Sequence, residues 1–271
     1  MRPTRFSLCL LFALGVTALM SQLSGRELPL TRAHAHNDYL HDRPLFDALD
    51  EGFCSVEADV FYLDGQFLVA HERPEVVAGR TLERLYLEPL RNRVQENNGS
   101  VQPGAADFLL WIDVKTDAEA AWPALRDLLL SYREILSVTE GGVLHRGAVS
   151  VIISGNRSAS LMLQETALPA TIDGRFSDLS LGLSPRVMSW LSDDYSRYFT
   201  WSGEGEMPPS QLEKLQEFVT AAHERGYRIR LWAIPDQPSA WSVLEESGVD
   251  LINTDDLKGL SRFLRDREKQ D

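Results

Sequence analysis

The stretch "CSVEADVFY", residues 54–62, decides the fold because its residues alternate between apolar and polar. Side chains along a β-strand point alternately to opposite faces, so this segment is predicted to be a strand with one apolar face. The other face carries Glu57 and Asp59. In a parallel sheet covered by helices, the apolar face packs against the helices, and the two acids point into a barrel interior or its mouth. An edge strand with a solvated acidic face is the alternative.

Two adjacent buried carboxylates repel each other, and each costs several kcal/mol to desolvate without a partner. We therefore expect a cation beside Glu57 and Asp59. The stretch "FLLWIDVKT", residues 108–116, repeats the alternation and places Asp113 and Lys115 on one face. Asp113 is a third candidate metal ligand and Lys115 a candidate for binding an anionic substrate, although the two could also form a structural pair. Oxygen ligands favour Ca²⁺ or Mg²⁺.

Three of the six histidines lie within eight residues, in the stretch "AHAHNDYLH", residues 33–41. His34 and His36 share one face of a short predicted strand, and His71 ends another, residues 67–71. A histidine pKa near 6.5 suits proton transfer near neutral pH. One histidine on each side of a metal-bound phosphate could supply an acid and a base. We favour His36 over His34 for the first role because it lies nearer the end of its strand.

Short β-like runs alternate with helix-like segments along the chain, which predicts a parallel α/β sheet, open or closed. The clearest helix runs from Ser210, with a capping-box spacing to Glu213, to Gly226, and it leads into a strand at 227–234. The predicted strands are 31–36, 54–62, 67–71, 108–115, 149–154, about 170–174, 227–234 and 249–253.

Residues 1–25 combine Arg2 and Arg5 with an apolar run and then small and polar residues. This order predicts a signal peptide, followed by one domain over 26–271, and hence a secreted or periplasmic protein. An uncleaved membrane anchor is the alternative, but the apolar run is short for one. We expect no stable membrane insertion after cleavage. Only Cys54 would then remain, which excludes an intramolecular disulfide.

Acidic residues outnumber basic ones by 40 to 27, and the chain carries a net charge of −13. Binding to nucleic acid needs a positive surface, so a nucleic-acid partner is not expected. The sequence gives no basis for predicting an oligomeric state.

These motifs together resemble the glycerophosphodiester phosphodiesterases and the phosphatidylinositol-specific phospholipase C-like enzymes. They are most similar to the branch named for altered inheritance of mitochondria protein 6. The matching segments are His36, "EADV" at 57–60, "DG" at 64–65, "HE" at 71–72, "WIDVK" at 111–115, "RLWAI" at 230–234 and "GVDLINTDD" at 248–256.

The resemblance implies a (β/α)₈ barrel with its active site at the C-terminal mouth. It also implies a metal-dependent phosphoric diester hydrolase that acts on a small phosphodiester or a lipid headgroup. The implied metal ligands are Glu57, Asp59 and Asp113, and the implied acid and base are His36 and His71.

The first site departs from the family pattern, because relatives commonly read H-R-G where this chain reads His36-Asn37-Asp38. Asn37 could replace part of the hydrogen bonding of the missing arginine. Arg230 could supply its charge, and Trp232, on the same face, is a further candidate for contact with substrate. Two alternatives stay open. One is a non-catalytic barrel that binds a phosphorylated or glycosyl ligand in the cell envelope, and the other is a zinc amidohydrolase-like barrel.

Overall fold

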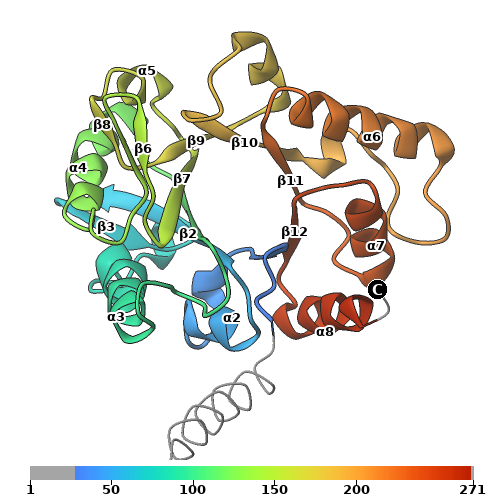
Figure 1. Ribbon diagram of the computed structural model, residues 1–271, viewed down its shortest axis with the longest axis horizontal. Coiled ribbons are helices and arrows are strands. Elements are labelled where there is room, and N and C mark those ends of the chain that lie inside the picture. The colour runs from blue at the N-terminus through green and yellow to red at the C-terminus, as the bar shows by residue number, and fades with distance from the viewer. Residues whose placement is uncertain (1–27, 270–271) are drawn as a thin grey trace, which may run out of the picture.

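The computed structural model describes residues 28–269, in which eight parallel strands close into a barrel with helices around it (Figure 1). β1 pairs with both β12 and β2, and these pairings close the ring. The predicted (β/α)₈ barrel is therefore confirmed. Its strands are β1 (Ala33–Ala35), β2 (Ser55–Leu63), β4 (Phe108–Val114), β7 (Val149–Gly155), β9 (Thr171–Gly174), β10 (Met188–Asp194), β11 (Arg228–Trp232) and β12 (Leu251–Thr254).

The alternation along the strands produces two buried layers. Outward-facing residues such as Val56, Ala58 and Ile112 pack against the surrounding helices in one large core. Inward-facing residues fill the barrel as a second cluster, which consists of Leu109, Trp111, Ile152, Trp190 and Leu251. The helices are α2 (Phe46–Asp50), α3 (Glu88–Glu96), α4 (Ala118–Leu130), α5 (Ala159–Met162), α6 (Pro209–His223), α7 (Pro238–Glu246) and α8 (Leu257–Glu268).

One predicted barrel strand lies outside the barrel. The segment predicted at 67–71 forms β3 (Gln66–Val69), which pairs antiparallel with β2. The reason is the connecting turn: Asp64 and Gly65 have φ values of 48° and 78°. Two successive residues with positive φ make a tight hairpin, which returns the chain beside the strand it has just left.

One barrel strand, β10, was not predicted. Its sequence, "MSWLSDD", mixes polar residues into both faces, so neither face shows a continuous apolar pattern. It nevertheless pairs in parallel with β9 and β11. The predicted capping box of α6 is also absent, because Pro208 occupies the N-cap position and no side chain caps this helix.

A three-stranded sheet of β5 (Val138–Glu140), β6 (Val143–His145) and β8 (Ala167–Leu168) lies beside the barrel. The short helical segments are η1 (Asp38–Leu40), η2 (Arg73–Glu75), η3 (Glu83–Leu87), η4 (Phe176–Leu181) and η5 (Tyr195–Arg197). Among residues 28–269, no helix combines the length and apolar character needed to cross a membrane.

Candidate active site

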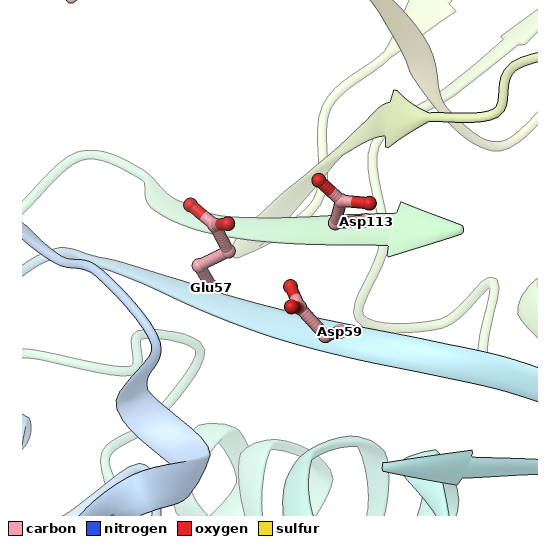
Figure 2. A group of neighbouring side chains, drawn as sticks. All are labelled: Glu57, Asp59 and Asp113. Carbon is pink, nitrogen blue, oxygen red and sulfur yellow. The ribbon is translucent and has the colours of Figure 1, made fainter. Parts of the chain in front are cut away.

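Three acidic side chains converge at the C-terminal mouth of the barrel. Figure 2 shows Glu57 and Asp59 extending from β2, and Asp113 from the neighbouring β4, toward one shared space. Asp59 and Asp113 are register partners, so the parallel pairing itself brings them together. One oxygen from each of the three carboxylates lies within 4.8 Å of the others. The predicted acidic cluster therefore exists as one group of side chains.

The acidic cluster carries more negative charge than its neighbours offset. Burial, followed by the charges of Glu57 and Asp113, raises the pKa of Asp59 to about 7. Lys115 Nζ lies 2.9 Å from Asp59 Oδ2 and 3.1 Å from Asp113 Oδ1. Asp59 Oδ1 is buried and has no hydrogen-bond partner in the described part of the chain. An unpartnered buried carboxylate oxygen within a repelling acidic group fits a divalent cation, which prefers such oxygen ligands.

Glu57 is neutralised from inside the barrel by Arg230. The Arg230 Nη1 atom donates to Glu57 Oε2 at 2.7 Å, and the guanidinium lies 4.0 Å from the centre of the Trp111 ring. Burial alone would raise the pKa of Glu57, but the charge of Arg230, the hydrogen bond with His34 and the charge of His36 together outweigh burial and hold this pKa well below its usual range. Arg230 is 3% exposed. Arg230 was predicted to supply a positive charge to the substrate, but its guanidinium instead pairs with Glu57 inside the barrel.

His34 is enclosed in the same network. Its Nδ1 lies 2.7 Å from Ser55 Oγ, and its Nε2 lies 2.6 Å from Arg230 Nη1 and 3.1 Å from Glu57 Oε2. A guanidinium can only donate, so Nε2 accepts and Nδ1 carries the proton. Burial, and then the charge of Arg230, lowers the pKa of His34 to about 4. His34 is fully buried, and neither of its ring nitrogens is free to exchange a proton with a substrate.

His36 lies at the mouth, beyond the last residue of β1. Its side chain is 29% exposed, and its Nδ1 lies 2.9 Å from Asp255 Oδ1, which comes directly after β12. Burial lowers the pKa of His36, but the hydrogen bond to Asp255 and the charges of Glu57 and Asp255 outweigh it and raise the pKa above its usual value. A carboxylate on Nδ1 fixes the ring orientation and leaves Nε2 for proton transfer.

His71 follows the hairpin strand β3 and is exposed. The backbone N–H of Ala70 donates to the carbonyl of Asp59 at 3.2 Å, which places His71 beside β2 at the level of the acidic cluster. Within the described residues its side chain has no hydrogen-bond partner. Its role as the second acid or base stays a prediction.

The remaining predicted substrate contacts surround the same mouth. Asn37 Oδ1 accepts from the hydroxyl of Tyr39 at 2.7 Å, and this hydroxyl also lies 2.7 Å from Asp59 Oδ2. The hydroxyl has one proton, so it donates to one of the two acceptors at a time. Trp232 ends β11 and is half-buried. The roles of Asn37, Trp232 and Lys115 toward substrate stay predictions.

Arg175 was not predicted, yet its charge acts on the mouth. It follows β9, and its Nη1 donates to Asp173 Oδ2 at 2.7 Å. Burial lowers the pKa of Arg175, but the carboxylates of Asp173, Asp193 and Asp113 outweigh it and raise the pKa, so the guanidinium lies within electrostatic range of the acidic cluster. Its side chain is 22% exposed, so it can still meet a solute. The signal in the sequence was the alternation of "IDGR", residues 172–175.

The chain matches the AIM6-like phosphodiesterase domain over residues 24–170. It is also 31% identical to an altered inheritance of mitochondria protein 6 homolog from Arthroderma benhamiae, over 85% of this chain and 82% of that protein. The altered inheritance of mitochondria protein 6 of Eremothecium gossypii is 30% identical, over 88% and 71%.

The chain belongs to the AIM6-like phosphodiesterase family. The resemblance expected from the motifs is therefore confirmed. Solved structures agree on the fold of this AIM6-like chain. A putative glycerophosphoryl diester phosphodiesterase from Silicibacter pomeroyi superposes with a TM-score of 0.56 at 16% identity, over 92% of this chain and 98% of that one. An Oleispira antarctica phosphodiesterase, solved with the product sn-glycerol-3-phosphate, gives 0.51 at 14% identity, over 88% and 97%.

The family assignment contradicts the predicted secreted or periplasmic location. The curated AIM6 relatives are fungal proteins named for altered inheritance of mitochondria, and that name refers to mitochondria rather than to secretion or a periplasm. The prediction relied on the order of residues in 1–25, which lie outside the described residues. The division into a signal peptide and one domain over 26–271 stays a prediction.

Gly155, at the end of β7, leaves room for the Asp113 carboxylate in this AIM6-like site. A Cβ atom at Gly155 would lie 2.0 Å from Asp113 Oδ1 and 2.7 Å from the carbonyl of Val114, and its φ of 65° also favours glycine. We expect Gly155→Ala to push Asp113 out of the acidic cluster and to weaken metal binding by about 10- to 100-fold, as loss of ligand support commonly does. Calorimetric titration with Ca²⁺ or Mg²⁺ measures this effect.

Gly182→Ala is the matched control, because it also has a positive φ, 59°, but no atom within 4 Å of the added Cβ. It should bind the metal like the unmodified protein. If Gly155→Ala binds equally well, Asp113 is not a ligand.

Proposed function

We propose that this protein is a metal-dependent phosphoric diester hydrolase of the glycerophosphodiesterase and phospholipase C-like type. The observation that carries the proposal is the convergence of Glu57, Asp59 and Asp113 at the mouth of the barrel, beside the partly exposed His36. Membership in a family described as a phosphodiesterase domain supports the same reaction class. The substrate we propose is a small phosphodiester or a lipid headgroup.

The acidic cluster would hold Ca²⁺ or Mg²⁺, which would neutralise charge on the phosphoryl oxygens. Lys115 adds a positive charge beside Asp59 and Asp113. Arg175 adds another positive charge at the same mouth. We propose that it supplies the charge of the arginine that is missing after His36. Fixed positive groups aimed at the phosphoryl oxygens stabilise the transition state more than the ground state.

The proton transfers are assigned to His36 and His71. One ring takes the proton of an attacking hydroxyl, either a neighbouring hydroxyl of the substrate or water, and the other gives a proton to the departing oxygen. His36 is the better candidate of the two histidines near β1, because His34 is enclosed by Ser55 and Arg230. His34 and Arg230 instead hold Glu57 in position.

Hydrolysis of a panel of glycerophosphodiesters and a chromogenic phosphodiester tests this function. The purified chain is assayed with Ca²⁺, with Mg²⁺ and with a chelator. We expect turnover that the chelator abolishes and that one of the two metals restores. Binding of these phosphodiesters without turnover under all three conditions would favour a non-catalytic phosphate-binding barrel instead.

The pH dependence of this activity depends on Asp255. The carboxylate raises the pKa of His36 in competition with burial, so Asp255→Asn is expected to lower that pKa. The limb of the pH–rate profile that reports His36 should shift to lower pH, and a histidine NMR titration measures the same shift directly. Asp256→Asn, the adjacent acid, bonds to Gly259 rather than to His36 and is the control. An unchanged His36 titration in Asp255→Asn contradicts the assignment.

A further inference from the structure

A pocket of about 650 Å³ lies at the end of the barrel opposite the acidic cluster. Its lining includes Thr171 and Arg228, the first residues of β9 and β11, and Ser150, the second residue of β7. Along β4 and β7, the pair Leu109 and Ser150 lies at this end, and the pair Asp113 and Ser154 lies at the mouth. Four residues of strand separate the two levels, which is about 13 Å. The pocket is thus distinct from the candidate active site.

Positive charge gathers in this pocket although the whole chain is acidic. Arg146, Arg186 and Arg228 line it, and Asp107 is the only acidic residue of its lining. Neither Arg146 nor Arg228 forms an ion pair with any residue in 28–269. Arg228 instead stacks on the ring of Trp190, with 4.1 Å from its guanidinium carbon to the ring centre. The charge of Asp107 reaches both arginines and that of Asp250 reaches Arg228, but neither acid forms a close ion pair with them. Arginines without a close carboxylate partner in a concave site are suited to bind phosphate or carboxylate.

Two buried polar atoms of the pocket lack partners in the described structure. Trp190 is 1% exposed, and its indole N–H has no acceptor. Asp107 Oδ1 is buried and unpartnered, while its Oδ2 accepts from Ser150. Buried polar groups are nearly always hydrogen-bonded, so these atoms indicate that a solute or water completes the site. The indole N–H can donate to an anionic solute, whereas Asp107 Oδ1 needs a donor such as water.

Apolar residues also line the pocket. Leu168, Val151 and Pro185 line it, and Val143 and Leu144 of the β6 strand are 58% and 40% exposed at its edge. Large apolar side chains exposed beside arginines match a ligand with both an acidic and a hydrocarbon part.

We propose that this pocket binds an amphiphilic organic anion, in which an acidic headgroup meets Arg146 and Arg228 and a short hydrocarbon portion covers Val143, Leu144 and Leu168. The proposal does not depend on the phosphodiesterase activity proposed above.

Calorimetric titration with hexyl phosphate tests it. The full chain is titrated in the presence of a chelator, because the metal-free acidic cluster then repels anions from the mouth. We expect saturable binding of one hexyl phosphate per chain, and at least about tenfold weaker binding of inorganic phosphate and of hexanol. Arg146→Met should weaken hexyl phosphate binding at least tenfold; Arg146 is exposed, so this variant should fold. Arg228→Met should do the same.

Arg225→Met is the matched control, since Arg225 is an exposed arginine that does not line the pocket. Two results would overturn the proposal: no saturable binding of hexyl phosphate, or equal binding by Arg146→Met and the unmodified chain. Equal affinity for inorganic phosphate and hexyl phosphate would overturn the amphiphilic part of it.

Discussion

Replacing His36 with alanine is expected to lower kcat for phosphodiester hydrolysis by about 10²- to 10⁴-fold, the usual contribution of a positioned acid or base. The ring is partly exposed at the mouth, and Asp255 orients it. His36 does not belong to the buried network around Glu57, so its removal should leave the fold intact. Steady-state kinetics and a thermal unfolding curve of the same preparation measure both effects.

His145→Ala is the matched control, because His145 is an exposed histidine on β6, away from the mouth. It should retain full activity. His71→Ala should resemble His36→Ala if the two rings share the proton transfers. Full activity of His36→Ala with an unchanged unfolding temperature would remove this residue from the mechanism.

Replacing Asp59 with asparagine is expected to abolish metal-dependent turnover and also to stabilise the metal-free protein above pH 7. Burial and the neighbouring carboxylates raise the pKa of Asp59 to about 7. A raised pKa means that the folded state holds the proton more tightly than the unfolded state does. Stability from this group is therefore complete below about pH 4 and is lost as the pH rises through about 7.

The difference between the Asp59 pKa in the unfolded chain, about 4, and in the folded protein, about 7, lowers the free energy of unfolding by about 4 kcal/mol once the pH exceeds 7. Loss of the ion pair with Lys115 offsets part of it, so we expect the free energy of unfolding to rise by about 2 kcal/mol at pH 8. Urea unfolding with a chelator at pH 5 and pH 8 measures the change, which should be smaller at pH 5. Asp266→Asn, an exposed acid on α8, is the control. A metal-free Asp59→Asn that is less stable at pH 8 contradicts the raised pKa.

Much of the candidate site could be predicted because two neighbouring strands alternate clearly. The pattern of 54–62 and 108–116 placed Glu57, Asp59 and Asp113 on inward faces, and parallel pairing brought them to one level. This prediction needed only the period of a strand. The barrel itself followed from the family motifs, because alternation alone could not distinguish an open sheet from a closed one.

The features of the site that could not be predicted depend on contacts between segments that are far apart in the chain. His34 and His36 share one face of β1, but only the packing of Arg230, 196 residues further along the chain, shows that His34 is enclosed. In the same way, only the folded structure shows that Arg230 points into the barrel and pairs with Glu57. β10 was missed because serine and aspartate interrupt the apolar residues on both of its faces, although Met188, Trp190 and Leu191 are buried in the fold.

The position of Lys115 has a consequence for the acidic cluster without a bound ion. Its ammonium group bridges Asp59 and Asp113, so the two carboxylates keep their places in the metal-free protein. If the cluster takes up a cation, as proposed above, the partly exposed Lys115 side chain would have to move aside for Asp59 and Asp113, and the strands that carry them would stay where they are.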